Sequence, residues 1–246
     1  MANLDGKTAL VTGGSRGMGA AIARRLAREG ARVTLTYASA EAAAAATVAA
    51  IEAAGGRAVA IKADNRDAAA LAAAVDATAK AEGRIDILVN NAGIFHAAPL
   101  SDLTLEDFDR TIDVNVRAVF VATRQAIAHM PDGGRIITIG SNLAQRVPWP
   151  GISLYALSKA ALSGFTRGIA RDLGPRGITA NIIHPGSTDT DMNPATGETA
   201  DMQRATMAIP RFGSPDDIAA FAIWLAGPEA RFVTGAEHVI DGGTNA

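Results

Sequence analysis

The sequence predicts an α/β fold, a single doubly wound parallel sheet of about seven strands with helices on both faces. Apolar segments rich in β-branched residues alternate along the chain with alanine-rich segments typical of helices. The apolar segments are continuous rather than alternating, as in strands that are buried on both faces. With 48% hydrophobic residues and no internal repeat or proline-rich linker, residues 1–246 are expected to form one domain.

The expected elements follow one another in strand, helix, strand order. Strands are expected at residues 7–12, 31–37, 58–63, 85–90, 135–140 and 178–184, and helices at 20–29, 40–54 and 68–81. Long helical stretches precede the last two of these strands. Ser214, Pro215 and the acids Asp216 and Asp217 have the pattern of a helix start. The least regular stretch, residues 187–212, contains two prolines and a glycine, and we expect it to be a mobile lid.

Composition and charge exclude several classes of function. The formal net charge of -2 and the scattered Lys and Arg residues provide no basic surface for nucleic acid. The absence of cysteine excludes disulfides and thiolate chemistry, and the four histidines lack metal-ligand spacing, so no catalytic metal is expected. Asp5 and Lys7 interrupt the opening residues, and the run Thr8–Thr12 is too short for a signal or membrane segment. We therefore expect a cytoplasmic protein.

A glycine-rich turn lies between the first strand and the first helix. In the segment Thr12–Gly19, the glycines Gly13, Gly17 and Gly19 would let backbone amides approach a pyrophosphate at the helix N-terminus. Glycines also serve plain tight turns, but a turn that opens a β-α-β unit favours nucleotide binding.

The residues after the second expected strand favour NADP(H) over NAD(H) as cofactor. An NAD site usually presents an acid to the ribose hydroxyls about 20 residues beyond the glycine motif. Here that position holds Tyr37, followed by Ala38 and Ser39. Arg16 in the glycine turn offers a guanidinium suited to a 2′-phosphate. The alternative is that Arg16 is merely a solvated loop residue.

The motifs, taken in order, resemble the classical group of the short-chain dehydrogenase/reductase family, and in particular its 3-oxoacyl-acyl-carrier-protein reductases. The markers are the turn from Thr12 to Gly19, Asp64, the run Asn90-Asn91-Ala92-Gly93, Asn115, Ser141, Tyr155 with Lys159, and Pro185-Gly186. The resemblance implies a Rossmann fold over almost the whole chain. The residues expected to contact the cofactor are Gly13, Ser15, Arg16, Gly17, Met18, Gly19, Tyr37, Ser39, Asp64, Asn65, Asn91, Ala92, Gly93, Tyr155, Lys159, Pro185, Gly186, Thr188 and Thr190.

Asn115, Ser141, Tyr155 and Lys159 are the candidate catalytic residues. Tyr155 and Lys159 are four residues apart, so on a helix they share one face, and a nearby ammonium favours the phenolate. In carbonyl reduction, Tyr155 would protonate the oxygen while Ser141 donates a hydrogen bond to it. The resemblance further implies that Lys159 holds the nicotinamide ribose and that Asn115, within a helix, positions water for a proton relay. Without the other motifs, the simpler interpretation would be that Tyr155 and Lys159 are an ordinary exposed pair four residues apart on a helix. Asn115 would then be a helix residue bonded to nearby backbone.

The substrate pocket is the least specified part of the site. Ser141 and Tyr155 are fourteen positions apart, one more than is commonest in the family, and the loop 146–151 is expected to absorb the extra residue. Ser153 is the rival serine, but Ser141 ends a strand at the edge where such sheets bind ligands. The expected pocket residues, largely apolar and suited to a medium-sized ketone, are Ser141, Leu143, Gln145, Trp149, Ile152 and Met192.

Taken together, these features predict an NADPH-dependent carbonyl reductase. The resemblance implies 3-oxoacyl thioesters as substrates, although the segment 128–134 has no Lys or Arg to dock an acidic carrier protein. It also implies a homotetramer. The small residues Ala156, Ala160, Ala161 and Gly164 would allow another helix to approach the helix that carries Tyr155, although core packing explains them equally well. The alternatives are an alcohol or polyol dehydrogenase that works oxidatively, and a Rossmann module that senses nucleotide without chemistry.

Overall fold

The computed structural model describes residues 3–246 and contains one seven-stranded sheet in the order β3-β2-β1-β4-β5-β6-β7. All neighbouring strands of this sheet pair in parallel. The strands are β1 (Thr8–Val11), β2 (Arg32–Tyr37), β3 (Arg57–Lys62), β4 (Ile87–Asn90), β5 (Arg135–Ile139), β6 (Thr179–Pro185) and β7 (Glu237–Ile240). The chain crosses from β3 past β1 to β4, so a crevice forms at the carboxyl ends of β1 and β4.

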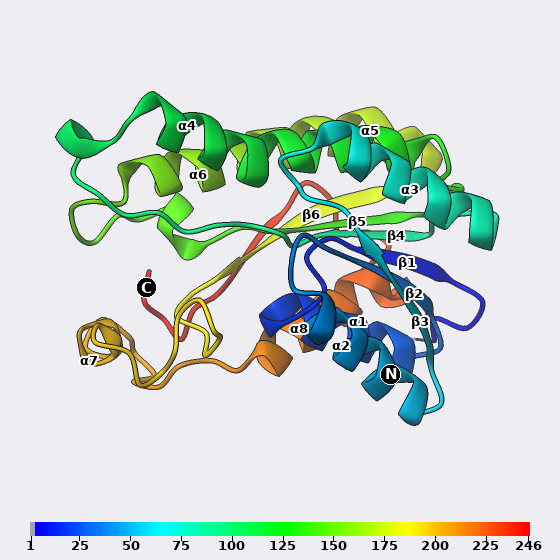
Figure 1. Ribbon diagram of the computed structural model, residues 1–246, viewed down its shortest axis with the longest axis horizontal. Coiled ribbons are helices and arrows are strands. Elements are labelled where there is room, and N and C mark those ends of the chain that lie inside the picture. Colours follow the sequence, from blue (N-terminus) through cyan, green and yellow to red (C-terminus); the bar gives the residue numbers. More distant parts are fainter. Residues whose placement is uncertain (1–2) are drawn as a thin grey trace.

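Helices cover both faces of this sheet, as the sequence predicted. Figure 1 shows α3, α4, α5 and α6 over one face and α1, α2 and α8 over the other, with α7 away from both layers. Their bounds are α1 (Gly17–Arg28), α2 (Glu41–Ala53), α3 (Ala68–Glu82), α4 (Leu105–Ile112), α5 (Ala118–Ile127), α6 (Ser153–Leu173), α7 (Ala200–Arg204) and α8 (Pro215–Ala226).

The central strands bury side chains on both faces, which explains their continuous apolar sequences. Val89 and Ile137 pack in one hydrophobic cluster with residues of α1 and α8. Their neighbours Leu88 and Ile136 pack in a second cluster with residues of α3 and α5. Because successive side chains of a strand point to opposite faces, each strand contributes to both layers.

Several details depart from the sequence-based expectations. Helix α1 begins at Gly17 rather than at residue 20, and the seventh strand, β7, was not located from its polar sequence. The predicted start of α8 is confirmed, because the Ser214 hydroxyl and the Asp217 carboxylate form a reciprocal capping box. Residues 187–212 include the short helix α7, which packs through Ala200 against Met207 and Phe212.

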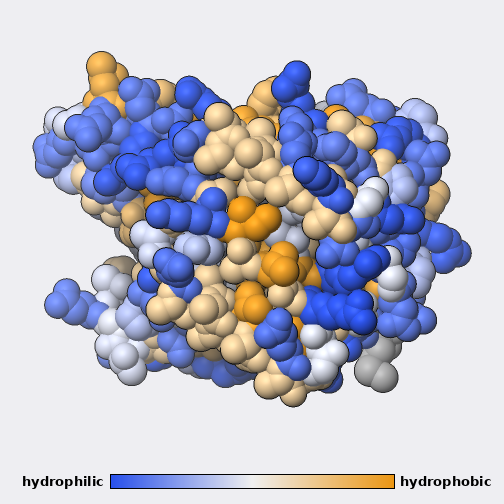
Figure 2. All heavy atoms as spheres, turned by 45° about the vertical axis from the view of Figure 1, so that its right-hand side comes forward, coloured by the Kyte–Doolittle hydropathy of each residue, from blue (hydrophilic) through white to orange (hydrophobic). Residues whose placement is uncertain are grey.

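The face seen in Figure 2 carries a small central group of hydrophobic side chains among hydrophilic ones. Among residues 3–246, no helix has both the length and the apolar character needed to cross a membrane.

Candidate active site

The glycine turn and the turn after β4 are locked together by hydrogen bonds at the carboxyl end of the sheet. The Asn91 side-chain amide donates to the carbonyl oxygens of Thr12, at 3.0 Å, and Gly13, at 2.9 Å. The Thr12 hydroxyl accepts from the backbone amides of Asn91 and Ala92. A Cβ atom on Gly19 would lie 2.4 Å from the Gly13 oxygen, so only glycine allows this close approach.

A cavity of about 600 Å³ opens beside these two turns. Most of the residues predicted to contact the cofactor line it, namely Gly13, Ser15, Arg16, Gly17, Met18, Gly19, Tyr37, Ser39, Asp64, Asn65, Asn91, Ala92, Gly93 and Thr190, together with Met192. It is also lined by residues that sequence reasoning missed, among them Arg66, Ile94, Phe95, Arg110, Val114 and Asp191. Ile94 and Phe95 directly follow the Asn-Asn-Ala-Gly run, and that position could have indicated them.

Charged side chains at the cavity are paired in ways the sequence did not indicate. Arg16 is exposed, and its guanidinium lies 3.8 Å from the carboxylate of Asp191. Arg66 donates to the Asp64 carboxylate at 2.8 Å, and this hydrogen bond lowers the pKa of Asp64. Tyr37 ends β2, and the residues beside it in the sequence, Thr36 and Ala38, are not acidic, so the end of this strand offers no carboxylate to a ribose.

Tyr155 and Lys159 are held together on the first turns of α6. The Lys159 ammonium lies 5.8 Å from the centre of the Tyr155 ring and donates to the Ile139 carbonyl oxygen at 3.1 Å. Only 4% of Lys159 is exposed, and burial lowers its pKa to about 8. Burial raises the pKa of Tyr155, and a hydrogen bond with the Ser141 hydroxyl opposes this rise. The interpretation as an exposed surface pair is therefore wrong.

Asn115 joins the turn after β4 to α6. Its side-chain oxygen accepts from the Ile94 backbone amide at 2.9 Å, and its amide group donates to the Ile94 carbonyl and to the Ser158 hydroxyl, both at 3.0 Å. Ser158 in turn donates to the Tyr155 carbonyl oxygen. Asn115 lies in a π-helical turn, Asp113–Arg117, between α4 and α5. Such turns are rare in proteins and frequent at functional sites.

Ser141 follows β5 and is buried, whereas the rival Ser153 is exposed at the start of α6. The backbone amide of Ser141 donates to Nδ1 of His184 at 3.1 Å. Of the two serines, Ser141 is the one whose side chain acts to lower the pKa of Tyr155. The Phe95 ring packs edge to face on Tyr155 with 4.9 Å between ring centres.

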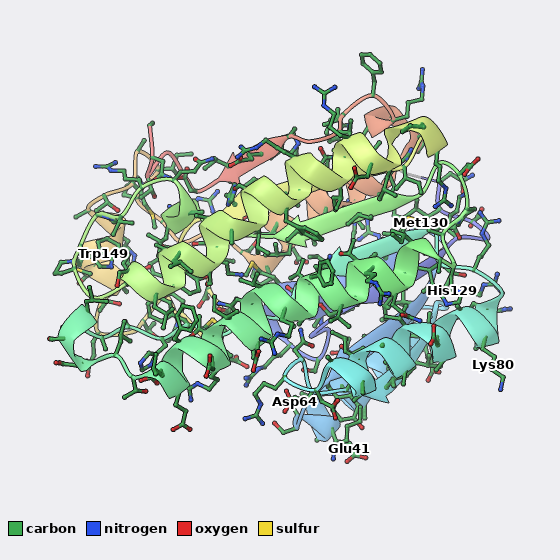
Figure 3. The ribbon with its side chains drawn as sticks, turned by 90° about the horizontal axis from the view of Figure 1, so that it is seen from above. Glu41, Asp64, Lys80, His129, Met130 and Trp149 are labelled. Atoms are coloured by element: carbon green, nitrogen blue, oxygen red, sulfur yellow. The ribbon has the colours of Figure 1, made fainter. Side chains whose placement is uncertain are left out.

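The predicted substrate residues are only partly brought together. Ile152 is 2% exposed and so belongs to the core rather than to the pocket surface, which corrects the sequence-based assignment. The Gln145 side chain donates to Glu237, and Met192 is largely exposed. Leu143 and Trp149 are half-buried. Figure 3 shows Trp149 near the start of α6, at the opposite end of the molecule from Lys80, His129 and Met130.

Residues predicted at the end of β6, among them Gly186 and Thr188, lie outside the lining of the cavity beside the glycine turn. Thr188 lines a second cavity, between the chain after β6 and α8, rather than the cavity that Thr190 lines. A Cβ atom on Gly186 would lie 2.5 Å from Cβ of Asp241, so the packing against Asp241 also requires a glycine here. Among residues 3–246, no group of three His, Asp or Glu side chains could hold a metal ion.

Comparisons with known proteins test the family resemblance of the chain. Residues 13–245 match the family model described as Enoyl-(Acyl carrier protein) reductase. A solved short chain dehydrogenase from Burkholderia cenocepacia, in complex with NADP, is 61% identical, with a TM-score of 0.98 over 99% of this chain and 100% of that one. The chain belongs to the short-chain dehydrogenase/reductase family.

Two curated relatives of this short-chain dehydrogenase/reductase have different names. The "Cyclic-di-GMP-binding biofilm dispersal mediator protein" of Escherichia coli is 47% identical over 246 residues, which is 100% of both chains. The "3beta-hydroxysteroid dehydrogenase 1" of Eggerthella lenta is 42% identical and covers 98% of this chain and 94% of its own. The names of these relatives do not agree on one substrate.

Proposed function

We propose that this oxidoreductase is an NADP(H)-dependent carbonyl reductase that interconverts a ketone and a secondary alcohol. The observation that carries the proposal is the buried Lys159 ammonium, 5.8 Å from the centre of the half-buried Tyr155 ring, with the buried Ser141 hydroxyl acting on the pKa of that tyrosine. Burial of an amine costs free energy of folding, so a buried amine beside a phenol indicates a functional role.

NADP(H) is the cofactor that the residues of the cavity fit best. The glycines leave the backbone of the turn free of side chains, so that it can approach a pyrophosphate. Arg16 can reach a 2′-phosphate, and no acidic residue ends β2 to oppose it. The NADP complex of the Burkholderia relative supports the same choice. When bound, the cofactor supplies the hydride; Lys159 would hold its nicotinamide ribose.

The side chains around Tyr155 would then handle the proton. Burial raises the pKa of the Tyr155 phenol, so near neutral pH the tyrosine carries the proton that the substrate oxygen needs. Ser141 would donate a hydrogen bond to that oxygen as negative charge develops on it. The π-helical turn leaves main-chain carbonyls with altered partners, and we assign the proposed water relay to the Asn115 turn.

The substrate is proposed at the level of a class. Phe95 and Met192 line the cavity, and we propose Leu143 and Trp149 as further pocket residues; this mostly apolar, partly aromatic set suits a medium-sized ketone, with 3-oxoacyl thioesters as one candidate. Alcohol oxidation in the opposite direction uses the same residues. The intact Tyr155–Lys159 pair argues against a purely nucleotide-sensing role.

The remaining proposals concern the surroundings of the site. We propose that residues 187–212 act as a lid, because Asp191 and Met192 line the cavity from that segment. A homotetramer is proposed from the family resemblance. Exposed apolar side chains on α5 and α6, such as Phe120 and Leu157, would be covered in such an assembly.

Substitution of the tyrosine tests the proposed function. Tyr155→Phe should lower turnover of NADPH with a ketone by about 10²- to 10⁴-fold, because it removes the proton donor. Binding of NADPH, measured by nucleotide fluorescence, should be retained. Ser153→Ala provides the matched control and should behave as wild type, whereas Ser141→Ala should be impaired. Full activity of Tyr155→Phe would refute the proposal.

A further inference from the structure

A series of hydrogen-bonded polar groups, buried at Ser141 and His184 and partly exposed at Glu237, lies behind Ser141. His184 on β6 is fully buried, and its Nδ1 accepts the backbone amide of Ser141 at 3.1 Å. Its Nε2 lies 3.1 Å from Oε2 of Glu237 on β7. These hydrogen bonds therefore connect the candidate catalytic serine to the edge strand of the sheet through one imidazole ring.

The hydrogen bonds determine which nitrogen of His184 carries the proton. A backbone amide can only donate, so Nδ1 must present its lone pair to Ser141. The Glu237 carboxylate can only accept when it is ionised, so Nε2 must carry the hydrogen. Burial lowers the pKa of His184, which keeps the ring neutral and leaves Nδ1 free to accept. Glu237 thus selects the tautomer that Ser141 needs.

Gly140 creates the space for this contact. A Cβ atom at Gly140 would lie 2.5 Å from Nδ1 of His184 and 2.8 Å from its Cε1 atom. Any other residue directly before Ser141 would push the imidazole away from the amide. The glycine, the serine and the histidine are therefore fitted to one another.

Glu237 also accepts hydrogen bonds from residues near the proposed substrate pocket and from α6. Gln145, in the loop after Ser141, donates to Oε2 of Glu237 at 3.3 Å, and the Ser163 hydroxyl donates to the same atom at 3.0 Å. The Arg167 guanidinium donates to the other oxygen at 2.5 Å. These contacts hold the carboxylate in one place, so the His184 ring has a fixed partner.

We propose that His184 and Glu237 are positioning residues that fix the main chain of Ser141, so that its hydroxyl stays directed at Tyr155 and the substrate oxygen. The proposal rests on the proposed role of Ser141. It assigns a task in this chemistry to two side chains that never touch the reacting atoms. The lone pair of Nδ1, rather than the bulk of the ring, is the feature that matters.

Paired substitutions separate the lone pair from the bulk. His184→Leu fills the space but cannot accept a hydrogen bond, whereas the Oδ1 atom of His184→Asn can take the place of Nδ1. We expect His184→Leu to lower kcat about tenfold, the effect of one lost hydrogen bond, with the KM for NADPH unchanged. His184→Asn should stay within about threefold of wild type. His238→Leu, the same substitution on the adjacent strand β7, should leave kcat unchanged.

The proposal is overturned if His184→Leu retains wild-type kcat, or if Asn and Leu at this position are equally impaired. A second measurement needs no variant that could fail to fold. Long-range proton–nitrogen NMR of the wild-type protein near pH 7.5 should show His184 as a neutral ring protonated at Nε2. A ring protonated at Nδ1, or a charged ring, overturns the proposal. Lack of turnover in the wild type would refute only the proposed function, because the NMR result does not depend on activity.

Discussion

Replacement of Lys159 by methionine should stabilise the cofactor-free protein at neutral pH. The pKa of Lys159 falls from 10.5 to about 8 because the amine is buried. At about 1.4 kcal/mol for each tenfold change in acidity, holding the ammonium in the fold costs about 3 kcal/mol. Methionine has a similar length and no charge, so Lys159→Met removes this cost. It also removes the hydrogen bond to Ile139, worth about 1 kcal/mol.

The sign and the pH window follow from the two pKa values. The unfolded chain binds this proton more tightly than the folded one, so the cost is complete below pH 8 and disappears as the pH rises toward 10.5. The variant should therefore exceed wild type by about 2 kcal/mol at pH 7, and the two should be nearly equal at pH 9.5.

Urea unfolding without nucleotide, at equal protein concentrations, measures this difference at both pH values. The same variant should lose most of its activity, so stability and catalysis would be opposed at this position. A wild type that is more stable than Lys159→Met at pH 7, or a difference that does not change with pH, would refute the reasoning about burial.

Three further substitutions test other parts of the account. Arg16→Ala should weaken NADPH binding about 10- to 100-fold in calorimetry and leave NADH binding nearly unchanged, because only NADPH has the 2′-phosphate; equal losses for both nucleotides would exclude this role. Gly19→Ala should abolish nucleotide binding while circular dichroism stays native, since its Cβ would lie 2.4 Å from the Gly13 oxygen; normal binding would show that the turn can adjust. Ser214→Ala should cost about 1 kcal/mol in urea unfolding through the lost cap of α8 and leave kcat unchanged, and an unaltered midpoint would argue against the cap.

The sheet and the glycine turn could be predicted because their signals are local. Continuous apolar segments indicate buried parallel strands, and glycines next to a strand and a helix indicate a close backbone approach. The short seventh strand was missed because Glu237 and His238 are polar, and they belong to a strand only through pairing with β6.

The parts of the site that were missed depend on contacts between distant residues. His184 and Glu237 are 53 positions apart, and only the pairing of β6 with β7 brings them together. The burial of Ile152 also follows from packing against the rest of the fold, which its place directly after a proline-containing loop did not indicate. The π-helical turn at Asn115 has no sequence signal that we recognise.

Transfer of an isotope label tests the central claim most directly. NADPH deuterated at the transferring C4 position would be incubated with the enzyme and a panel of β-keto esters, 3-oxoacyl thioesters and cyclic or aryl ketones, and the products analysed by mass spectrometry. We predict an alcohol that carries one deuterium on the former carbonyl carbon, and no such product with Tyr155→Phe. Oxidised cofactor without deuterium in any product, or equal transfer by Tyr155→Phe, would contradict the account.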